Sequence, residues 1–353
     1  MGSSTTSRIL MGVVGVLILA SAALAQTPPA AEAPRRTIEP IAGSVYRAMN
    51  NNAGTVFMVT PDGILLADPL NVEFAQWLKA EFATRFKVPV RYVVYSHHHW
   101  DHASGGSVFA DTALFVGHAN MLPYLAMPST STTLSQITGG YAPVAKLDAN
   151  RDGVVEKSEA PNVRNFDNYD ANRDGRLSGA EVARGPVSFV HPPTITYTDR
   201  MQISLGGKRV ELSWVGDFNH SRDGSDMAFP DDNVLFIVDY VSFHRLPRME
   251  MDYHDGKFKE WLAVIRNAEK KAAGYKFVAT GHGPMGTVKD VTAWREYFEK
   301  LQAAVAAGLK AGQTLEQMQA SITMPEFSHW EGHKDGWVPL NVLGMYHFLT
   351  DTP

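Results

Sequence analysis

Five side chains that can bind a metal ion lie within six consecutive residues, in the segment His97-His98-His99-Trp100-Asp101-His102. The segment follows Val90 to Tyr95, an apolar run with the composition of a buried strand, after the single residue Ser96. In an extended segment alternate side chains share a face, so His97 and His99 should point one way and His98 the other. Imidazole and carboxylate are ligand types that Zn2+ accepts. The segment therefore predicts chemistry that depends on a metal ion.

Further polar side chains stand at or just after the ends of other apolar strands, namely Asp68, His220, Asp239 and His282. Such residues can meet at one edge of a sheet although they are far apart in the sequence. The chain has no cysteine, which excludes disulfides, thiolate ligands and a cysteine nucleophile. We therefore expect a metal site built only from histidine and carboxylate groups.

Together these residues form the pattern His-x-His-x-Asp-His, a later His, an acid after a strand and a final His, which resembles the metallo-β-lactamase superfamily. The resemblance covers about Ser44 to Gly286 and implies an α/β fold, a four-layer αββα sandwich. It assigns one metal ion to His97, His99 and His220, and the second to Asp101, His102 and His282, with Asp239 bridging both. Asp68 resembles the family's structural aspartate that braces the metal loop, and His98 and Trp100 are expected to be neighbours rather than ligands.

The resemblance implies a hydrolase with two zinc ions, in which a hydroxide that bridges the ions attacks a carbonyl group of a small-molecule substrate. Asp101 and Asp239 would be the catalytic carboxylates, and iron or manganese could replace zinc. Asp239 favours ester, thioester or lactone substrates, because the family's true β-lactamases generally carry Cys or Ser at this place. A β-lactamase, an iron-dependent dioxygenase and a calcium-dependent binding module remain alternatives.

The hexapeptide Asp-Ala-Asn-Arg-Asp-Gly occurs twice, at 148–153 and 170–175. Each copy begins a twelve-residue EF-hand pattern, in which alternate side-chain oxygens, one backbone carbonyl and a final Glu surround a calcium ion. The apolar residues Val155 and Leu177 should pair through a short β-bridge. The spacing of the copies resembles dockerin-type calcium modules and favours a structural clamp holding two calcium ions. The predicted ligands are Asp148, Asn150, Asp152, Val154 and Glu159 in the first loop, and Asp170, Asn172, Asp174, Arg176 and Glu181 in the second.

Alternating apolar patterns predict the elements that position these residues. A helix capped by Asn71 should place an apolar stripe on the opening strands, and Ser129 to Gly140 should form a surface loop that overhangs the site. The predicted strands are 44–49, 55–60, 64–67, 90–95, 113–116, 194–197, 201–205, 208–214, 225–229, 233–238 and 276–280, with a long helix at 256–273 and helices from residue 288.

The remaining features concern the address and organisation of the chain. Arg8, the apolar run Ile9 to Ala20 and Ala23-Leu24-Ala25 indicate a cleavable signal peptide, so a periplasmic or secreted protein is expected. An uncleaved membrane anchor is the alternative, but the run is shorter than the ~20 residues a spanning helix needs. The predicted divisions are 1–25 signal peptide, 26–43 flexible leader, 44–142 and 187–311 catalytic domain, 143–186 calcium module and 312–353 helical extension.

The formal net charge of −5 indicates no basic face, so nucleic acid is not expected as a partner. The histidines that stand alone in the sequence are expected to be structural: His118, His191, His244, His254 and His347. His329 and His333 stand beside Trp330 and Trp337 and could line the substrate pocket.

Overall fold

A seven-stranded sheet carries the N-terminal half of the fold, in the order β1-β2-β3-β4-β5-β6-β9. Strands β1 to β4 form an antiparallel meander, whereas β4, β5, β6 and β9 run parallel. Parallel neighbours bring their carboxyl ends to the same edge, where polar side chains can meet. The strands are β1 (Arg36–Ala42), β2 (Val45–Asn50), β3 (Ala53–Thr60), β4 (Gly63–Ala67), β5 (Val90–Val94), β6 (Leu114–His118) and β9 (Ile195–Tyr197).

The computed structural model describes residues 1, 33–163, 165–217, 220–247, 249 and 258–350. Apart from Met1, the predicted signal peptide lies outside the described residues, as do residues 26–32 of the predicted leader and His254. Among the described residues, no helix combines the length and the apolar character needed to cross a bilayer.

A second, five-stranded sheet follows the order β10-β11-β12-β13-β14. It is antiparallel except for the last pair, in which β13 and β14 run parallel. Val56 and Leu65 from the first sheet share a buried cluster with Val210 and Met227 from the second, so the two sheets pack face to face. The strands are β10 (Arg200–Leu205), β11 (Lys208–Trp214), β12 (Ser225–Phe229), β13 (Val234–Phe236) and β14 (Phe277–Ala279).

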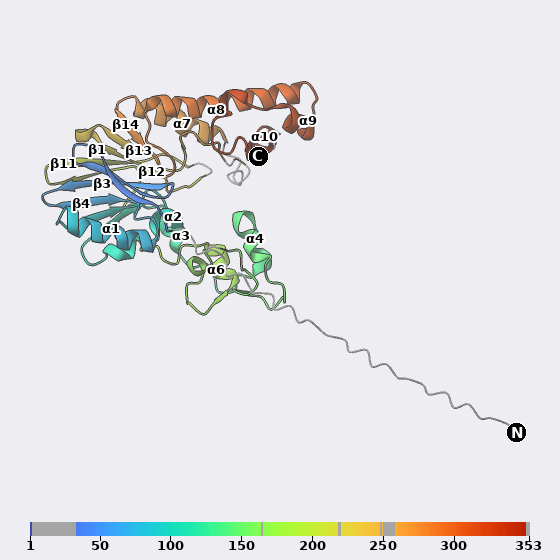
Figure 1. The fold of residues 1–353 in the computed structure, drawn as a ribbon, viewed down its shortest axis with the longest axis horizontal. Coiled ribbons are helices and arrows are strands. Elements are labelled where there is room, and N and C mark those ends of the chain that lie inside the picture. The colour runs from blue at the N-terminus through green and yellow to red at the C-terminus, as the bar shows by residue number, and fades with distance from the viewer. Residues whose placement is uncertain (2–32, 164, 218–219, 248, 250–257, 351–353) are drawn as a thin grey trace. The chain divides into compact units, whose positions relative to one another are not determined.

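Helices cover the outer face of each sheet, which gives the expected four layers (Figure 1). On the first sheet lies α1 (Val72–Arg85), whose cap Asn71 accepts a hydrogen bond from the Phe74 N–H at 3.0 Å. Its apolar side chains Phe74, Leu78 and Phe82 are buried, as the stripe predicted. Two short helices, α2 (Trp100–Ala103) and α3 (Met121–Leu125), follow β5 and β6.

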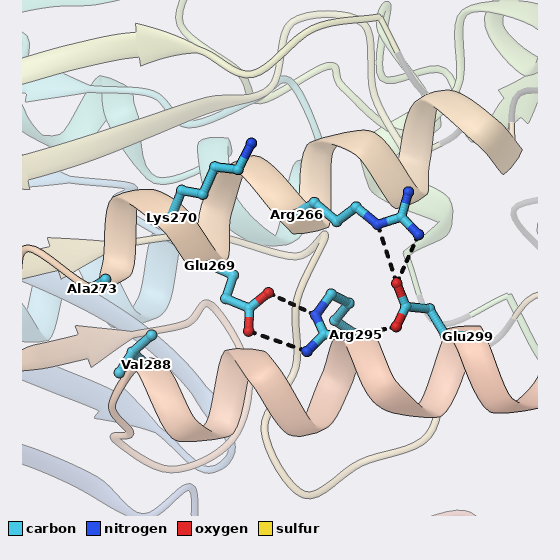
Figure 2. A pocket seen from close by; sticks show the side chains of 7 residues that line it. All are labelled: Arg266, Glu269, Lys270, Ala273, Val288, Arg295 and Glu299. Atoms are coloured by element: carbon cyan, nitrogen blue, oxygen red, sulfur yellow. Dashed lines mark hydrogen bonds and ion pairs between the residues drawn. The ribbon is translucent and has the colours of Figure 1, made fainter.

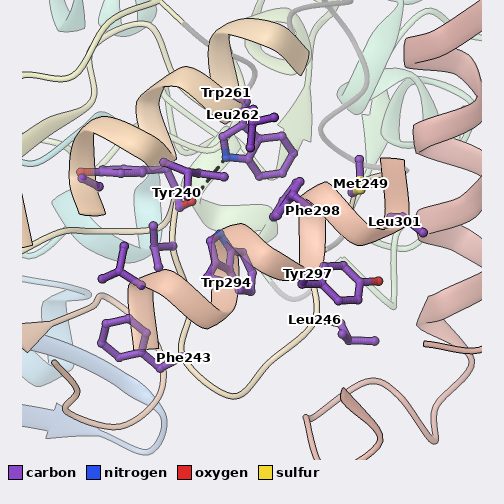
Figure 3. Close-up of a cluster of buried hydrophobic side chains, with 14 of the residues drawn as sticks. Tyr240, Phe243, Leu246, Met249, Trp261, Leu262, Trp294, Tyr297, Phe298 and Leu301 are labelled. Carbon is purple, nitrogen blue, oxygen red and sulfur yellow. Dashed lines mark hydrogen bonds between the residues drawn. The ribbon is translucent and has the colours of Figure 1, made fainter. Parts of the chain in front are cut away.

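The second sheet is covered by a cluster that includes Trp261, Trp294, Tyr297 and Phe298 (Figure 3). An ion-pair network on the outside of this layer joins two helices: Arg295 binds both Glu269 and Glu299 (Figure 2). The residues after 312 are mainly helical, as expected. The helices are α7 (Phe258–Ala272), α8 (Val288–Lys310), α9 (Leu315–Ser321) and α10 (Trp337–Thr350).

The insertion between β6 and β9 has its own small core, to which Phe166, Tyr169 and Val182 contribute. As predicted, Val155 pairs with Leu177 in a two-stranded ladder that joins the two Asp-rich loops. Its elements are α4 (Ala142–Ala145), β7 (Val155–Glu156), α5 (Phe166–Tyr169), β8 (Arg176–Leu177) and α6 (Gly179–Arg184).

Two sequence expectations need correction. Residues 36–42 were expected in a flexible leader, but they form β1. Their backbone pairs with β2, with Arg36 opposite Asn50 at one end and Ala42 opposite Val45 at the other. The 129–140 segment was expected to be an aperiodic loop over the site and outside the insertion. Instead it contains a short 3-10 helix, Leu134–Gln136, and Leu134 is buried in the core of the insertion. The insertion therefore begins before the predicted boundary at residue 143.

Candidate metal centre

The histidine-rich segment leaves β5 and turns at once into α2. His99 is the N-cap of this helix and has non-helical backbone angles (φ −57°, ψ 138°), so the helical turn begins directly after it. His97 and His99 therefore lie before the turn, whereas Asp101 and His102 lie within α2. One short segment thus supplies candidate ligands both from the chain before the helix and from the helix itself.

The other three predicted ligands come from the second sheet. His220 lies in the connection from β11 to β12, Asp239 follows β13, and His282 follows β14. The His282 loop is also bound to the first sheet, since the Gly54 N–H donates to the Gly281 carbonyl at 2.7 Å and the Gly283 N–H donates to the Asn52 carbonyl at 3.1 Å. These bonds bring the ends of both sheets to one place.

The seven side chains form two groups that share Asp239. Within each group the candidate ligand atoms all lie within 4.8 Å of one another: His97, His99, His220 and Asp239 in the first group, and Asp101, His102, His282 and Asp239 in the second.

The distances between ligand atoms show that the side chains of each group converge on one point. In the first group, His220 Nε2 is 3.3 Å from His97 Nε2 and 3.7 Å from Asp239 Oδ2. In the second, Asp239 Oδ2 lies 2.9 Å from His102 Nε2 and 3.5 Å from His282 Nε2. Asp101 Oδ2 is 3.3 Å from His282 Nε2.

Electrostatics differ between the two groups. Burial, together with the neighbouring histidines, lowers the pKa of His97 and His99 well below the ordinary value. The charge of Asp239 instead raises the pKa of His282 to about 9. Burial opposes ionisation of Asp101, but His102 and His282 outweigh it and bring its pKa to about 2. His97 and His99 in the first group are therefore neutral at pH 7, whereas in the second group Asp101 is ionised beside a protonated His282.

The donor set fits two divalent metal ions. It consists of imidazole nitrogens and carboxylate oxygens, the ligands of zinc sites that lack cysteine. Asp239 Oδ1 is buried and makes no hydrogen bond to any described residue, although a buried carboxylate oxygen normally has a partner. A metal ion between the two groups would supply that partner.

A buried hydrogen-bond chain orients His97. Ser96 donates to Asp68 twice, from its N–H to Oδ1 at 2.7 Å and from its Oγ to Oδ2 at 2.6 Å. Ser96 Oγ therefore accepts from Nδ1–H of His97, 2.9 Å away, which leaves Nε2 of His97 free to bind a metal. Asp68 itself has a positive φ of 35°, a strained conformation that its contacts maintain. Asp68 thus binds the residue that directly precedes the histidine-rich segment.

Several residues of the site were not identified from the sequence. Besides Ser96 they include Gly281, where an added Cβ would lie 2.4 Å from Asp239 Oδ1 and 2.7 Å from His102 Cε1. Arg47 is buried, which lowers its pKa to about 10, and its Nη2 donates to the Gly283 carbonyl at 2.5 Å. The pattern Gly281-His282-Gly283 could have suggested the glycine, but no local signal marks Arg47.

The other described histidines lie outside both groups. His118 stacks on Trp214, and His244 lies 3.1 Å from Asp290. His191 stacks on Phe115, and His347 belongs to α10. His333, which could have lined the pocket, lies 2.8 Å from the Thr323 carbonyl, and His329 packs near Trp330.

The two Asp-rich loops repeat one hydrogen-bond pattern. Asp148 Oδ2 accepts from the Gly153 N–H at 3.1 Å, and Asp170 Oδ2 accepts from the Gly175 N–H at 2.9 Å. Each final Glu accepts a backbone N–H near the start of its loop at 2.9 Å, Glu159 from Ala149 and Glu181 from Ala171. Asn150 and Asn172 each accept from the Asp two residues later, Asp152 and Asp174. Among the described residues, no three carboxylates of either loop come within 4.8 Å of one another.

No protein-family model and no curated protein matches this sequence. Solved structures match it in fold. A stereoselective inverting sec-alkylsulfatase from Pseudomonas sp. aligns with a TM-score of 0.60 and 15% identity, over 88% of this chain and 50% of that chain. A metallo-β-lactamase from Pseudomonas aeruginosa in its mono-zinc form aligns with a TM-score of 0.51 and 12% identity, over 75% of this chain and 95% of that one. The chain thus has the metallo-β-lactamase fold, as the sequence predicted, and spans half the length of the alkylsulfatase.

Proposed function

We propose that the protein is a metal-dependent hydrolase whose two ligand groups hold two zinc ions. The observation that carries this proposal is the position of Asp239, whose Oδ2 lies 2.9 Å from His102 Nε2 and 3.7 Å from His220 Nε2. One carboxylate is thus in reach of both groups, while its Oδ1 makes no hydrogen bond to a described residue. Two ions held in this way would supply a water with a pKa near 7 and a Lewis acid for the substrate.

The side chains of the site then have distinct tasks. His97, His99 and His220 would hold the first ion, and Asp101, His102 and His282 the second, with Asp239 shared. Asp101 is part-exposed and ionised at neutral pH, so it can accept a hydrogen bond from a water and orient it toward the substrate.

The substrates we propose are carboxylic esters, thioesters and lactones. A carboxylate at position 239 supports them, given the resemblance to superfamily members that carry Asp at this place. The fold alone does not select among substrates, and the alkylsulfatase and β-lactamase that share it act on different bonds. Alkyl sulfates and β-lactams therefore belong in any substrate panel.

Metal analysis with a substrate panel tests this function. Protein purified without added metal should contain about two zinc ions per chain, and it should hydrolyse at least one carboxylic ester, thioester or lactone. Asp239→Asn should abolish turnover and lower the metal content, whereas Asp232→Asn, a change at another buried carboxylate, should affect neither.

Three results would contradict the proposal. Zinc-loaded protein that turns over none of these substrates is not the proposed hydrolase. Hydrolysis confined to β-lactams would make it a β-lactamase, and one iron per chain with oxygen consumption would make it a dioxygenase.

We further propose that the insertion binds one calcium ion in each loop and acts as a clamp. The repeated bonds around Asp148 and Asp170, with Glu159 and Glu181 folded back to the loop starts, support this arrangement. In each loop an ion would be coordinated by the side-chain oxygens, by the carbonyl of Val154 or Arg176 and by the final Glu. Export to the periplasm or medium, proposed from Arg8 and the apolar run after it, would expose the loops to calcium. Detection of the mature chain beginning at Gln26 in the exported fraction would test the address.

A further inference from the structure

His98 stands between two candidate ligands but points away from both groups. Its Nδ1 lies 2.9 Å from Asp223 Oδ1, and its ring stacks on Tyr124 with centroids 3.8 Å apart and planes at 2°. A carboxylate can only accept, so Nδ1–H of His98 is the donor. Ser221 Oγ donates to the same oxygen of Asp223. All three polar side chains are buried, so this small network is shielded from water.

The network joins two segments that are far apart in the sequence. On one side, His98 is flanked by His97 and His99. On the other side, Ser221 is the next residue after His220, and Asp223 is the third. A backbone bond between the same segments, from the Ser225 N–H to the Ser96 carbonyl at 2.9 Å, lies beside it. The bond from His98 to Asp223 therefore connects the segment that carries His97 and His99 to the segment that carries His220.

The second group has different supports. Asp101 and His102 lie in α2, and the His282 loop is held by Gly54, Asn52 and Arg47. None of these supports passes through Asp223. A change at Asp223 should thus reach the first group and largely spare the second.

If the pair served only to pack the chain, it would stabilise the fold less than apolar side chains of similar size would. Asp223 is 1% exposed, and its Oδ2 makes no hydrogen bond to any described residue. A buried carboxylate with an unpaired oxygen destabilises a fold relative to apolar side chains of similar size. What apolar side chains could not supply is a directional bond that fixes the separation of two segments.

We propose that His98 and Asp223 are a positioning pair, which sets His220 against His97 and His99 and thereby determines the metal affinity of the first group. The proposal rests on the metal centre of the proposed function. Partners that orient metal ligands typically change metal affinity by about 10- to 100-fold when they are removed.

Zinc competition titrations on metal-free full-length protein test the pair, because they measure affinity without any substrate. His282→Ala disables the second group and leaves the first to be measured, and His99→Ala does the reverse. In the His282→Ala background, Asp223→Ala should weaken zinc binding by about 10- to 100-fold. In the His99→Ala background, the same change should alter it by less than about threefold.

Further variants separate positioning from general packing. His98→Phe keeps a ring against Tyr124 but removes the donor, so it should weaken the first group as Asp223→Ala does. Asp223→Asn keeps an oxygen that accepts from His98 and should restore most of the affinity. Asp232→Ala removes a buried carboxylate that binds Ser44 and Lys208, and it should leave both groups unchanged.

Each other outcome overturns the proposal. If Asp223→Ala leaves the first group unchanged, the pair only packs. If it weakens both groups equally, or if Asp232→Ala does the same, the effect is general destabilisation. If the unsubstituted chain binds no zinc, both this inference and the proposed function fail, whereas normal zinc binding with unaffected variants contradicts only the inference.

Discussion

The two candidate metal-binding regions of this molecule are built in opposite ways. The histidine centre takes its seven side chains from four separate parts of the chain, and its donor atoms already lie within 4.8 Å in each group. Each Asp-rich loop takes its candidate ligands from twelve consecutive residues, and its carboxylates are engaged by the loop's own N–H groups. The sheets therefore organise the first region, whereas local backbone geometry organises the second.

This difference predicts which perturbations each region can withstand. Groups that converge through distant supports depend on exact packing, so small changes at the centre should alter metal affinity and turnover. A loop that is coordinated locally can lose its ion without moving the sheets, so changes there should appear mainly as altered stability.

The largest expected contrast is between removing Asp239 and removing Glu181. Asp239→Ala should lower turnover by at least about 100-fold, because a metal ion contributes several kcal/mol of transition-state stabilisation. Glu181→Gln should leave turnover within about twofold and instead lower the melting temperature in the presence of calcium. Parallel kinetics and thermal unfolding measure both, and a loss of turnover in Glu181→Gln at a temperature where it is folded would erase the contrast.

A pair of glycine substitutions gives the next contrast. In Gly281→Ala the new Cβ would meet Asp239 Oδ1 at 2.4 Å, so the shared ligand must shift, and we expect metal affinity to fall by about 10- to 100-fold. At Gly153 an added Cβ meets nothing within 4 Å, but φ is +90°. Gly153→Ala should therefore cost about 1–2 kcal/mol of stability and leave zinc affinity unchanged. Zinc titration of both variants measures the change in metal affinity, and denaturant unfolding measures the change in stability.

The pH dependence of ion binding should also separate the regions. In the metal-free protein the raised pKa of His282, about 9, means that a proton must leave before the metal binds at neutral pH. Zinc affinity of the second group should thus rise about tenfold per pH unit for each proton released, up to about pH 9. Hydrogen bonds from the N–H groups of Glu156 and Asn150 lower the pKa of Glu159, so calcium affinity should be flat from about pH 6 to 9.

Competition titrations at several pH values would measure both slopes. The same shift has a consequence for stability. Because the folded pKa of His282 exceeds the ordinary 6.5, its contribution to the stability of the metal-free protein is complete below that value and is lost as the pH rises through about 9. A zinc affinity that does not change with pH would contradict the assignment of His282 as a ligand.

The smallest effect on turnover should follow removal of calcium with EGTA while the free zinc concentration is held constant. At a calcium concentration of about 100 Kd, one site contributes about 2.7 kcal/mol, so the melting temperature should fall by several degrees. Turnover at 25 °C should change by less than about twofold. An unchanged melting temperature, under conditions shown to empty both loops, would contradict the clamp.

The same contrast explains how much the sequence could predict. The Asp-rich loops could be predicted because their candidate ligands are contiguous, although calcium binding stays a prediction. The confirmed pairing of Val155 with Leu177 follows from their matching positions in the two loops. The histidine centre could be predicted only because its candidate ligands stand near strand ends, and because the alternation of side chains in an extended segment separates His98 from His97 and His99. Asp223 and Arg47 carry no such signal, since their importance arises from the tertiary contacts of the folded chain.

The backbone bond from the Gly54 N–H to the Gly281 carbonyl has a mechanical consequence. Gly54 belongs to the first sheet, and Gly281 follows β14 of the second. The candidate ligands therefore lie beside a hydrogen bond that joins the two sheets. Metal ions bound there would cross-link the two sheets, and the sheets could not separate without releasing the ions. Slower hydrogen exchange at the Gly54 amide on zinc loading would reveal this locking, and release of the metal would then be the event that commits the sandwich to unfold.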